Sequence, residues 1–249
     1  MNKIDEFKRG KTMFRTLLKW VAVAMLVPAL WPAWAGSIGH ATAAAQSAFA
    51  SAAEQHGAAI ERGKIVGWPG GNGVIYPTVG FFGTSEVFAV GAVHPDGSFQ
   101  IHFPAILPVD MLQTTAAQCP TFHSSDPALL SNSTGNYLLF QHGKQIGATH
   151  AGTSQAIAAF TGIANGDTRT GFLYADRSTI QSGYCQRTLS FGGHSVDFRQ
   201  NLDLHLHKGW NSVVAHFSIP QAGHIVSDLT VNSNRAGQTW FFFRPPTQP

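Results

Sequence analysis

Charged residues are scarce in this chain of 249 residues, of which Asp, Glu, Lys and Arg make up 12%, against about 25% in an ordinary soluble protein. The formal net charge of +3 comes from the N-terminus, where six Lys and Arg precede Trp20 and only Asp5 and Glu6 oppose them. From Gly36 onward, 10 Lys and Arg stand against 11 Asp and Glu, a net charge of −1. We therefore expect no basic face that would bind nucleic acid through its phosphates.

Motifs of several enzyme classes are also missing. The chain contains no Gly-x-Ser-x-Gly nucleophile elbow, no phosphate-binding loop and no dinucleotide-binding fingerprint. Ser154 follows His150 by four residues, but no strand–turn–helix pattern supports a serine hydrolase there. The sequence leaves enzymatic activity open and favours a non-enzymatic protein.

Long apolar runs are absent except near the N-terminus. The run from Trp20 to Ala35 has 16 residues and two prolines, whereas a membrane-spanning helix needs about 20 apolar residues. A basic segment precedes it and Ala33-Trp34-Ala35 ends it, so residues 1–35 are predicted to be a secretory signal peptide, with an alternative cut after residue 45. An uncleaved anchor is the alternative, and it would be the only part in a membrane. We expect an exported protein that is periplasmic, cell-surface or extracellular.

Cysteine occurs twice, as Cys119 and Cys185. In an exported chain, two cysteines most simply form one disulfide. Two buried free thiols are the alternative. Zinc binding by this pair is not favoured, because neither cysteine belongs to a Cys-x-x-Cys motif.

The remaining sequence is rich in turns and in strand-forming residues. Residues 36–60 are Ala-rich and predict a partly helical spacer. Residues 61–249 predict a β domain, possibly two subdomains at about 61–118 and 135–249. Its most definite element is a hairpin from Glu86 to Phe103, in which Pro-Asp-Gly supplies the turn. Many short strands joined by Gly and Pro turns predict an all-β protein with an antiparallel β-sandwich fold, preceded by the signal helix and the spacer.

Two segments carry a partial resemblance to known β modules. GKIVGW followed by AVHPDGSFQIHFP, about 40 residues in all, resembles the opening of carboxypeptidase-regulatory-like, transthyretin-like β-sandwich modules. LHKGWNSVV resembles a hairpin of uncharacterised exported bacterial β-proteins. The resemblance implies a secreted β-sandwich and no catalytic residues. The spacing of GWPGGNGVIYPTVGFF departs from that of these modules.

Histidines gather in the segment NLDLHLHKGWNSVVAHF, residues 201–217. Alternation predicts a hairpin whose loop is 208–211, with Leu202, Leu204 and Leu206 facing the core. In this register Asp203 lies opposite His216, and His205 lies diagonal to it at roughly 7–8 Å between Cα atoms. The opposite face would then present the residues Asp203, His205, His207 and His216.

Three imidazoles and a carboxylate on one face are a possible zinc site, if they converge to about 2 Å from the ion. The alternatives are a weak, adventitious zinc or nickel site, or simply the polar outer face that an antiparallel hairpin needs. His102, His194 and His224 are candidates for a further ligand. Trp210, in the predicted loop, either stacks on a sugar or partner or packs back over the hairpin end.

The main functional hypothesis is an exported, non-enzymatic β-sandwich protein with a structural, adhesive or ligand-binding role in the cell envelope or outside the cell. It implies no cofactor. The alternative is a zinc-type metal-binding protein that uses the histidine face of residues 201–217.

Overall fold

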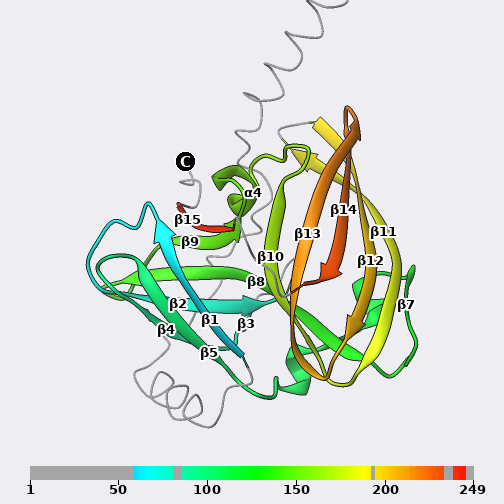
Figure 1. Cartoon of the computed structure of the whole chain (residues 1–249), viewed down its shortest axis with the longest axis horizontal. Helices are drawn as coiled ribbons and strands as arrows, with labels where there is room; N and C mark the ends of the chain where they lie inside the picture. Colours follow the sequence, from blue (N-terminus) through cyan, green and yellow to red (C-terminus); the bar gives the residue numbers. More distant parts are fainter. Residues whose placement is uncertain (1–58, 81–85, 192–193, 233–237, 245–249) are drawn as a thin grey trace, which may run out of the picture.

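A computed structural model describes residues 59–80, 86–191, 194–232 and 238–244 (Figure 1). The predicted signal peptide and all but the last two residues of the predicted spacer lie outside them. The described residues form one continuous sheet of 15 strands with two very short α-helices. The prediction of an all-β protein is confirmed.

Half of the sheet forms a barrel-like ring, called the barrel below. Seven strands form the ring in the order β2-β4-β5-β1-β15-β9-β8, and β8 closes it by pairing with β2. The short strand β3 extends β2 at the edge, and β10 of the other half pairs with both β8 and β9. The strands of the barrel are β1 (Ala59–Val66), β2 (Gly73–Val79), β3 (Glu86–Val87), β4 (Gly91–Val93), β5 (Ser98–Phe103), β8 (Leu130–Gln141), β9 (Lys144–Gly152) and β15 (Thr239–Phe243).

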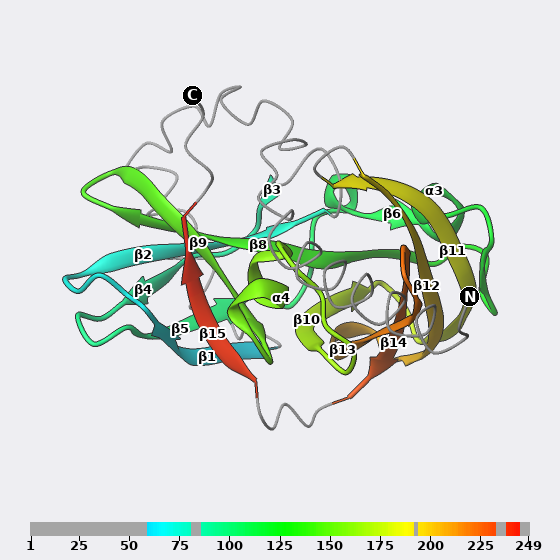
Figure 2. The ribbon, with the colours of Figure 1, turned by 90° about the horizontal axis from the view of Figure 1, so that it is seen from above.

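The other half is a strongly bent continuation of the same sheet, called the curved sheet below. It has the order β10-β13-β14-β12-β11-β7 and wraps around a second interior (Figure 2). Its strands are β7 (Phe122–Ser124), β10 (Thr168–Ala175), β11 (Thr179–Phe191), β12 (His194–Leu206), β13 (Gly209–Gln221) and β14 (His224–Val231). Strand β8 joins the halves: residues 131–133 pair with β10, and residues 134–141 pair with β2 and β9.

This topology corrects the prediction of an antiparallel sandwich. A sandwich has two separate sheets, whereas here one sheet runs through both halves and closes on itself at β2–β8. Two of the pairings are also parallel, β1 with β15 and β12 with β14. Both bring together strands that are not neighbours in the sequence, and alternation within a strand carries no information about such partners.

Local signals in the sequence explain most turns and helices. In the β4–β5 hairpin, Gly97 has φ +84° and Asp96 accepts hydrogen bonds from Ser98. The predicted hairpin is therefore confirmed for residues 91–103, but Glu86 and Val87 pair with β2 instead. Helix α4 (Gln155–Ala159) begins where the Ser154 hydroxyl accepts from the amide of Ile157.

The long connection between β5 and β8 contains the remaining short elements. They are a 3-10 turn, η1 (Val109–Met111), the two-residue strand β6 (Gln113–Thr114) and helix α3 (Thr115–Gln118). Thr114 caps α3 by accepting from the amide of Ala117. This connection lies against β8, because β6 pairs with residues 130 and 131.

The barrel interior is filled by aromatic rings. Phe103 is completely buried, and its ring centroid lies 5.0 Å from those of Phe88 and Phe172 and 4.9 Å from that of Trp210. Trp210 also stacks on Phe88 and donates its indole N–H to the carbonyl of Pro104 at 2.8 Å. Trp210 therefore packs back onto the protein, and it ties the start of β13 to the barrel.

The predicted hairpin of residues 201–217 is wrong in its pairing. Strand β14 lies between β12 and β13 and bonds to both, parallel to the first and antiparallel to the second. The buried Asn211 side chain holds the short connection instead, since it accepts from the amide of His207 and donates to the carbonyls of His207 and Gly209. The predicted faces are nevertheless correct: Leu202, Leu204 and Leu206 are buried, and Asp203, His205, His207 and His216 are exposed.

Candidate functional site

The structure does not bring the predicted metal ligands together. His216 is level with Asp228 of β14, which is level with Asn201 of β12. His205 is therefore two strand spacings, about 10 Å, across the sheet from His216 and four residues, about 13 Å, along it. Asp203 is likewise separated from His216, because β14 lies between their two strands.

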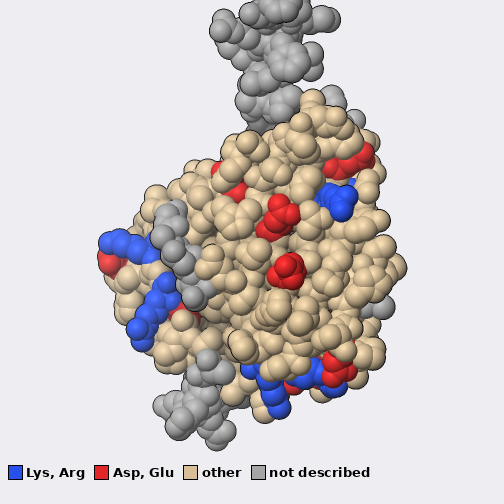
Figure 3. Space-filling view, turned by 45° about the vertical axis from the view of Figure 1, so that its right-hand side comes forward, with Lys and Arg blue, Asp and Glu red and all other residues tan. Residues whose placement is uncertain are grey.

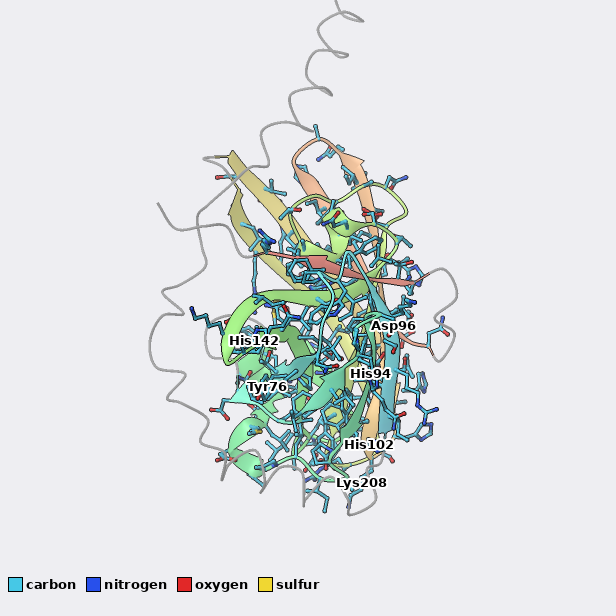
Figure 4. The ribbon with its side chains drawn as sticks, turned by 90° about the vertical axis from the view of Figure 1, so that its left-hand side faces the viewer. Tyr76, His94, Asp96, His102, His142 and Lys208 are labelled. Carbon is cyan, nitrogen blue, oxygen red and sulfur yellow. A yellow bond between two sulfur atoms is a disulfide. The ribbon has the colours of Figure 1, made fainter. Side chains whose placement is uncertain are left out.

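Other histidines do not complete a site there. His224 lies near Asp197 at the opposite end of β14, and His102 lies on β5 of the barrel beside Gln100. Figure 4 shows His94, His102 and His142 spread over the barrel rather than gathered. The side chain of His194 is outside the described part. Among the described residues, no group of three or more His, Cys, Asp or Glu is placed to hold a metal ion.

The predicted disulfide between Cys119 and Cys185 is present. It connects the end of α3 to β11, with 5.9 Å between the two Cα atoms, and both residues are buried. It thereby fastens β11 to the connection between β5 and β8. Cys185 also lines a hollow in this half of the molecule.

This hollow is a cavity of about 390 Å³ on the concave face of the curved sheet. Strands β10 to β14 form one wall, and parts of β8, α3 and the residue after α4 form the other. Its volume falls at the lower end of the range of about 300–1,000 Å³ that is typical of small-molecule sites. The curved sheet is therefore hollow where the barrel is filled.

The cavity exists because polar or small residues occupy inward positions in the middle of the strands. In β12 the inward series is Phe198, Gln200 and Leu202, and in β13 it is Phe217, Ala215 and Val213. Below and above this middle level the strands carry apolar side chains, which form two separate core clusters. Gln200 is level with Ser227 of β14, Ala215 is level with Arg169 of β10, and Arg187 of β11 is level with Phe198.

The opposite wall adds amides and hydroxyls. Gln118 of α3 donates to the carbonyl and hydroxyl oxygens of Ser131, and its own side-chain oxygen accepts from Gln181 at 3.4 Å. Gln181 is fully buried, and its side-chain carbonyl oxygen has no hydrogen-bond partner among the described residues. A buried polar atom that lacks a partner costs about 1–3 kcal/mol, so this oxygen marks a place where a ligand donor would be stabilising.

Arg169 is the most unusual residue of the cavity wall. Its Nε is buried and lacks a hydrogen-bond partner, and its guanidinium lies 5.6 Å from the centroid of the Phe160 ring. No hydrogen bond or salt bridge of the Arg169 guanidinium to another side chain is found among the described residues, although the Tyr137 hydroxyl interacts with it electrostatically. Burial lowers the pKa of Arg169 to about 10, against a smaller opposing effect of Tyr137. The group remains a cation at neutral pH, and it has no carboxylate beside it.

No acidic residue lines the cavity within the described ranges. The charged side chains in its wall are Arg169 and Arg187, and His150 is the one imidazole. Arg187 is exposed and donates to the carbonyl of Gln118, which places it at a rim where the cavity reaches solvent. The interior therefore combines positive charge with apolar walls from residues such as Phe198, Phe217 and Leu173.

Reasoning from the sequence missed this site. The available signal was the interruption of apolar inward positions, as in Phe198-x-Gln200-x-Leu202 and Ile225-x-Ser227-x-Leu229. Such an interruption shows that an inward position is polar, but only the sheet topology shows that Gln200 and Ser227 lie side by side. On the face shown in Figure 3, charged residues are few and scattered, so they give no comparable signal.

Comparisons with protein-family models, with curated proteins and with solved structures find no match to this chain. The resemblance to regulatory-like modules therefore stays a prediction. Within the described ranges, no helix has the length and apolar character needed to cross a membrane.

Proposed function

We propose that this chain is an exported binding protein that holds a small molecule in the cavity of its curved sheet. The observation that carries the proposal is the cavity of about 390 Å³ whose wall contains buried polar atoms without partners, at Arg169 and Gln181. A sheet with a purely structural role would be expected to fill this level with apolar side chains, as the barrel does.

Export is supported by two features. The described part contains one disulfide, which persists in oxidising compartments, and residues 1–35 have the composition of a signal peptide. Sequencing the N-terminus of the protein recovered from outside the cytoplasm tests this part of the proposal. A mature chain that begins at Gly36 or Gln46 is expected, and recovery of the intact leader in the cytoplasm would contradict export.

Binding is tested with a neutral apolar dye, N-phenyl-1-naphthylamine, whose fluorescence rises in a dry environment. The folded protein is expected to bind one equivalent of dye. Ala215→Phe places a ring in the cavity and is expected to abolish the signal. The matched control is Ala222→Phe in the exposed β13–β14 turn, which adds the same ring outside the cavity. Equal dye binding by both variants would place the dye elsewhere and refute the cavity as the site.

A further inference from the structure

We infer that the cavity selects an organic carboxylate with an apolar body, and that Arg169 binds the carboxylate group. This inference rests on the proposed function and specifies the chemistry of its ligand. It starts from the wall of the cavity, where cations and apolar rings occur without any acidic side chain among the described residues.

Arg169 is held in place without being neutralised. It lies on β10 between Ala215 of β13 and Gly152 of β9, so its backbone is fixed by strands on both sides. The Phe160 ring supports the guanidinium through a cation–π contact, which does not use the N–H donors. Its Nε donor therefore remains buried and unused.

A planar guanidinium with free donors matches a carboxylate, because two parallel N–H···O bonds can form. Arg177 shows this pairing within the chain, because it binds the carboxylates of Asp176 at 2.8 Å and Asp126 at 3.2 Å. Arg169 is partly buried with a buried, unpaired Nε, so an external carboxylate could pair with it as Asp176 and Asp126 pair with Arg177.

The rest of the ligand is constrained by the remaining wall. The rings of Phe198 and Phe217 and the side chain of Leu173 offer an apolar surface, and the unpaired Gln181 oxygen offers an acceptor for one donor group. A compact carboxylic acid with an aliphatic or aromatic body fits these features, whereas a cation would meet two arginines.

The test compares octanoate with octanamide, which share size and shape and differ in charge. Displacement of bound N-phenyl-1-naphthylamine from the full chain measures both affinities. Since a hydrogen bond to a charged group contributes about 1.5–3 kcal/mol, octanoate is expected to bind about tenfold to a hundredfold more tightly than octanamide. Equal affinity would overturn the inference while leaving the proposed cavity intact. Failure of the dye itself to bind would instead refute the proposed function.

Variants of Arg169 test whether this residue causes the preference for octanoate over octanamide. In Arg169→Met the octanoate-to-octanamide ratio is expected to fall to about one, with dye binding retained, and Arg169→Lys is expected to restore part of the ratio. Arg62→Met is the matched control, because Arg62 lies on the outside of β1 and bonds to Gln100. An unchanged ratio in Arg169→Met, or displacement of octanoate by inorganic phosphate at similar concentration, would overturn the assignment. The comparison of the two ligands on the unmodified protein does not depend on how well any variant folds.

Discussion

In both the barrel and the curved sheet, inward and outward side chains alternate along the strands, yet only the barrel interior is filled by side chains. Inward positions of the barrel carry Phe99, Phe103, Tyr137 and Trp240, whose rings lie edge to face. Inward positions that line the cavity of the curved sheet carry Gln200, Ala215 and Ser227. Alternation thus decides which side chains face inward, whereas side-chain volume decides whether an interior becomes a core or a site.

The difference also separates stability from function within one sheet. A close-packed aromatic interior gains from burial and ring contacts, while unpaired polar atoms around a cavity cost free energy. We expect the barrel and the two apolar clusters to stabilise the fold. The polar residues that line the cavity should lower stability but allow a ligand to bind.

The largest difference is expected between two phenylalanines. Phe103→Ala removes a fully buried ring that touches three others, and should lower the free energy of unfolding by about 3–5 kcal/mol. Phe198→Ala removes a ring that already borders the cavity, so fewer contacts are lost and about half that cost is expected. Urea unfolding followed by fluorescence measures both. Equal losses would show that the curved sheet is as tightly packed as the barrel.

The disulfide should act on one half only. Replacing both Cys119 and Cys185 by alanine opens a loop of 66 residues and is expected to cost about 4 kcal/mol on the chain-entropy model. Amide hydrogen exchange should accelerate in α3, β7 and β11 and stay unchanged in β4 and β5. A reductant should reproduce this pattern in the unmodified protein and have no effect on the double variant. Uniform acceleration throughout both halves would refute the separation.

A larger side chain should destabilise the barrel interior but not the cavity of the curved sheet. Ala151→Leu, next to Trp240 in the barrel, is expected to lower the free energy of unfolding by about 1–3 kcal/mol through overpacking. Ala215→Leu adds the same atoms to the cavity and is expected to leave stability unchanged or slightly higher. Thermal and urea unfolding of the two variants provide the measurement. A comparable loss in Ala215→Leu would mean that the cavity is not free to accept the added side chain.

The sequence predicted features that depend on neighbouring residues and failed for those that depend on distant ones. Residues 202–207 alternate, and their inner and outer faces followed directly. Their partners did not, because β14 could enter between β12 and β13 without changing either face. For that reason the four predicted zinc ligands do not come together. Arg169 escaped notice because a single arginine in a strand is usually on the outside, and its inward position depends on the bend of the whole sheet.

The smallest effect is expected at the acidic pair around Arg177, at the end of the curved sheet. Hydrogen bonding to Arg177, with a further bond from the amide of Leu130, lowers the pKa of Asp176 below its ordinary value. Because the folded-state pKa is the lower one, the stabilisation is complete above the unfolded pKa of about 3.9 and is lost as the pH falls through the folded value. Asp176→Asn should therefore cost about 0.5–1 kcal/mol at pH 7 and make the variant's stability less dependent on pH below 5.

The control for this prediction lies in the barrel. Lys64 and Asp96 form an exposed ion pair at 3.3 Å, with side chains 67% and 57% exposed, and Lys64→Met should leave stability unchanged within error. Hydrogen bonds from Ser98, rather than Lys64, are the main cause of the lowered pKa of Asp96, about 2, so removing the lysine leaves that carboxylate bonded. Urea unfolding from pH 7 to pH 3 compares the two variants. If Lys64→Met lost as much stability as Asp176→Asn, charge pairing would not distinguish the two halves, and their difference would lie in packing alone.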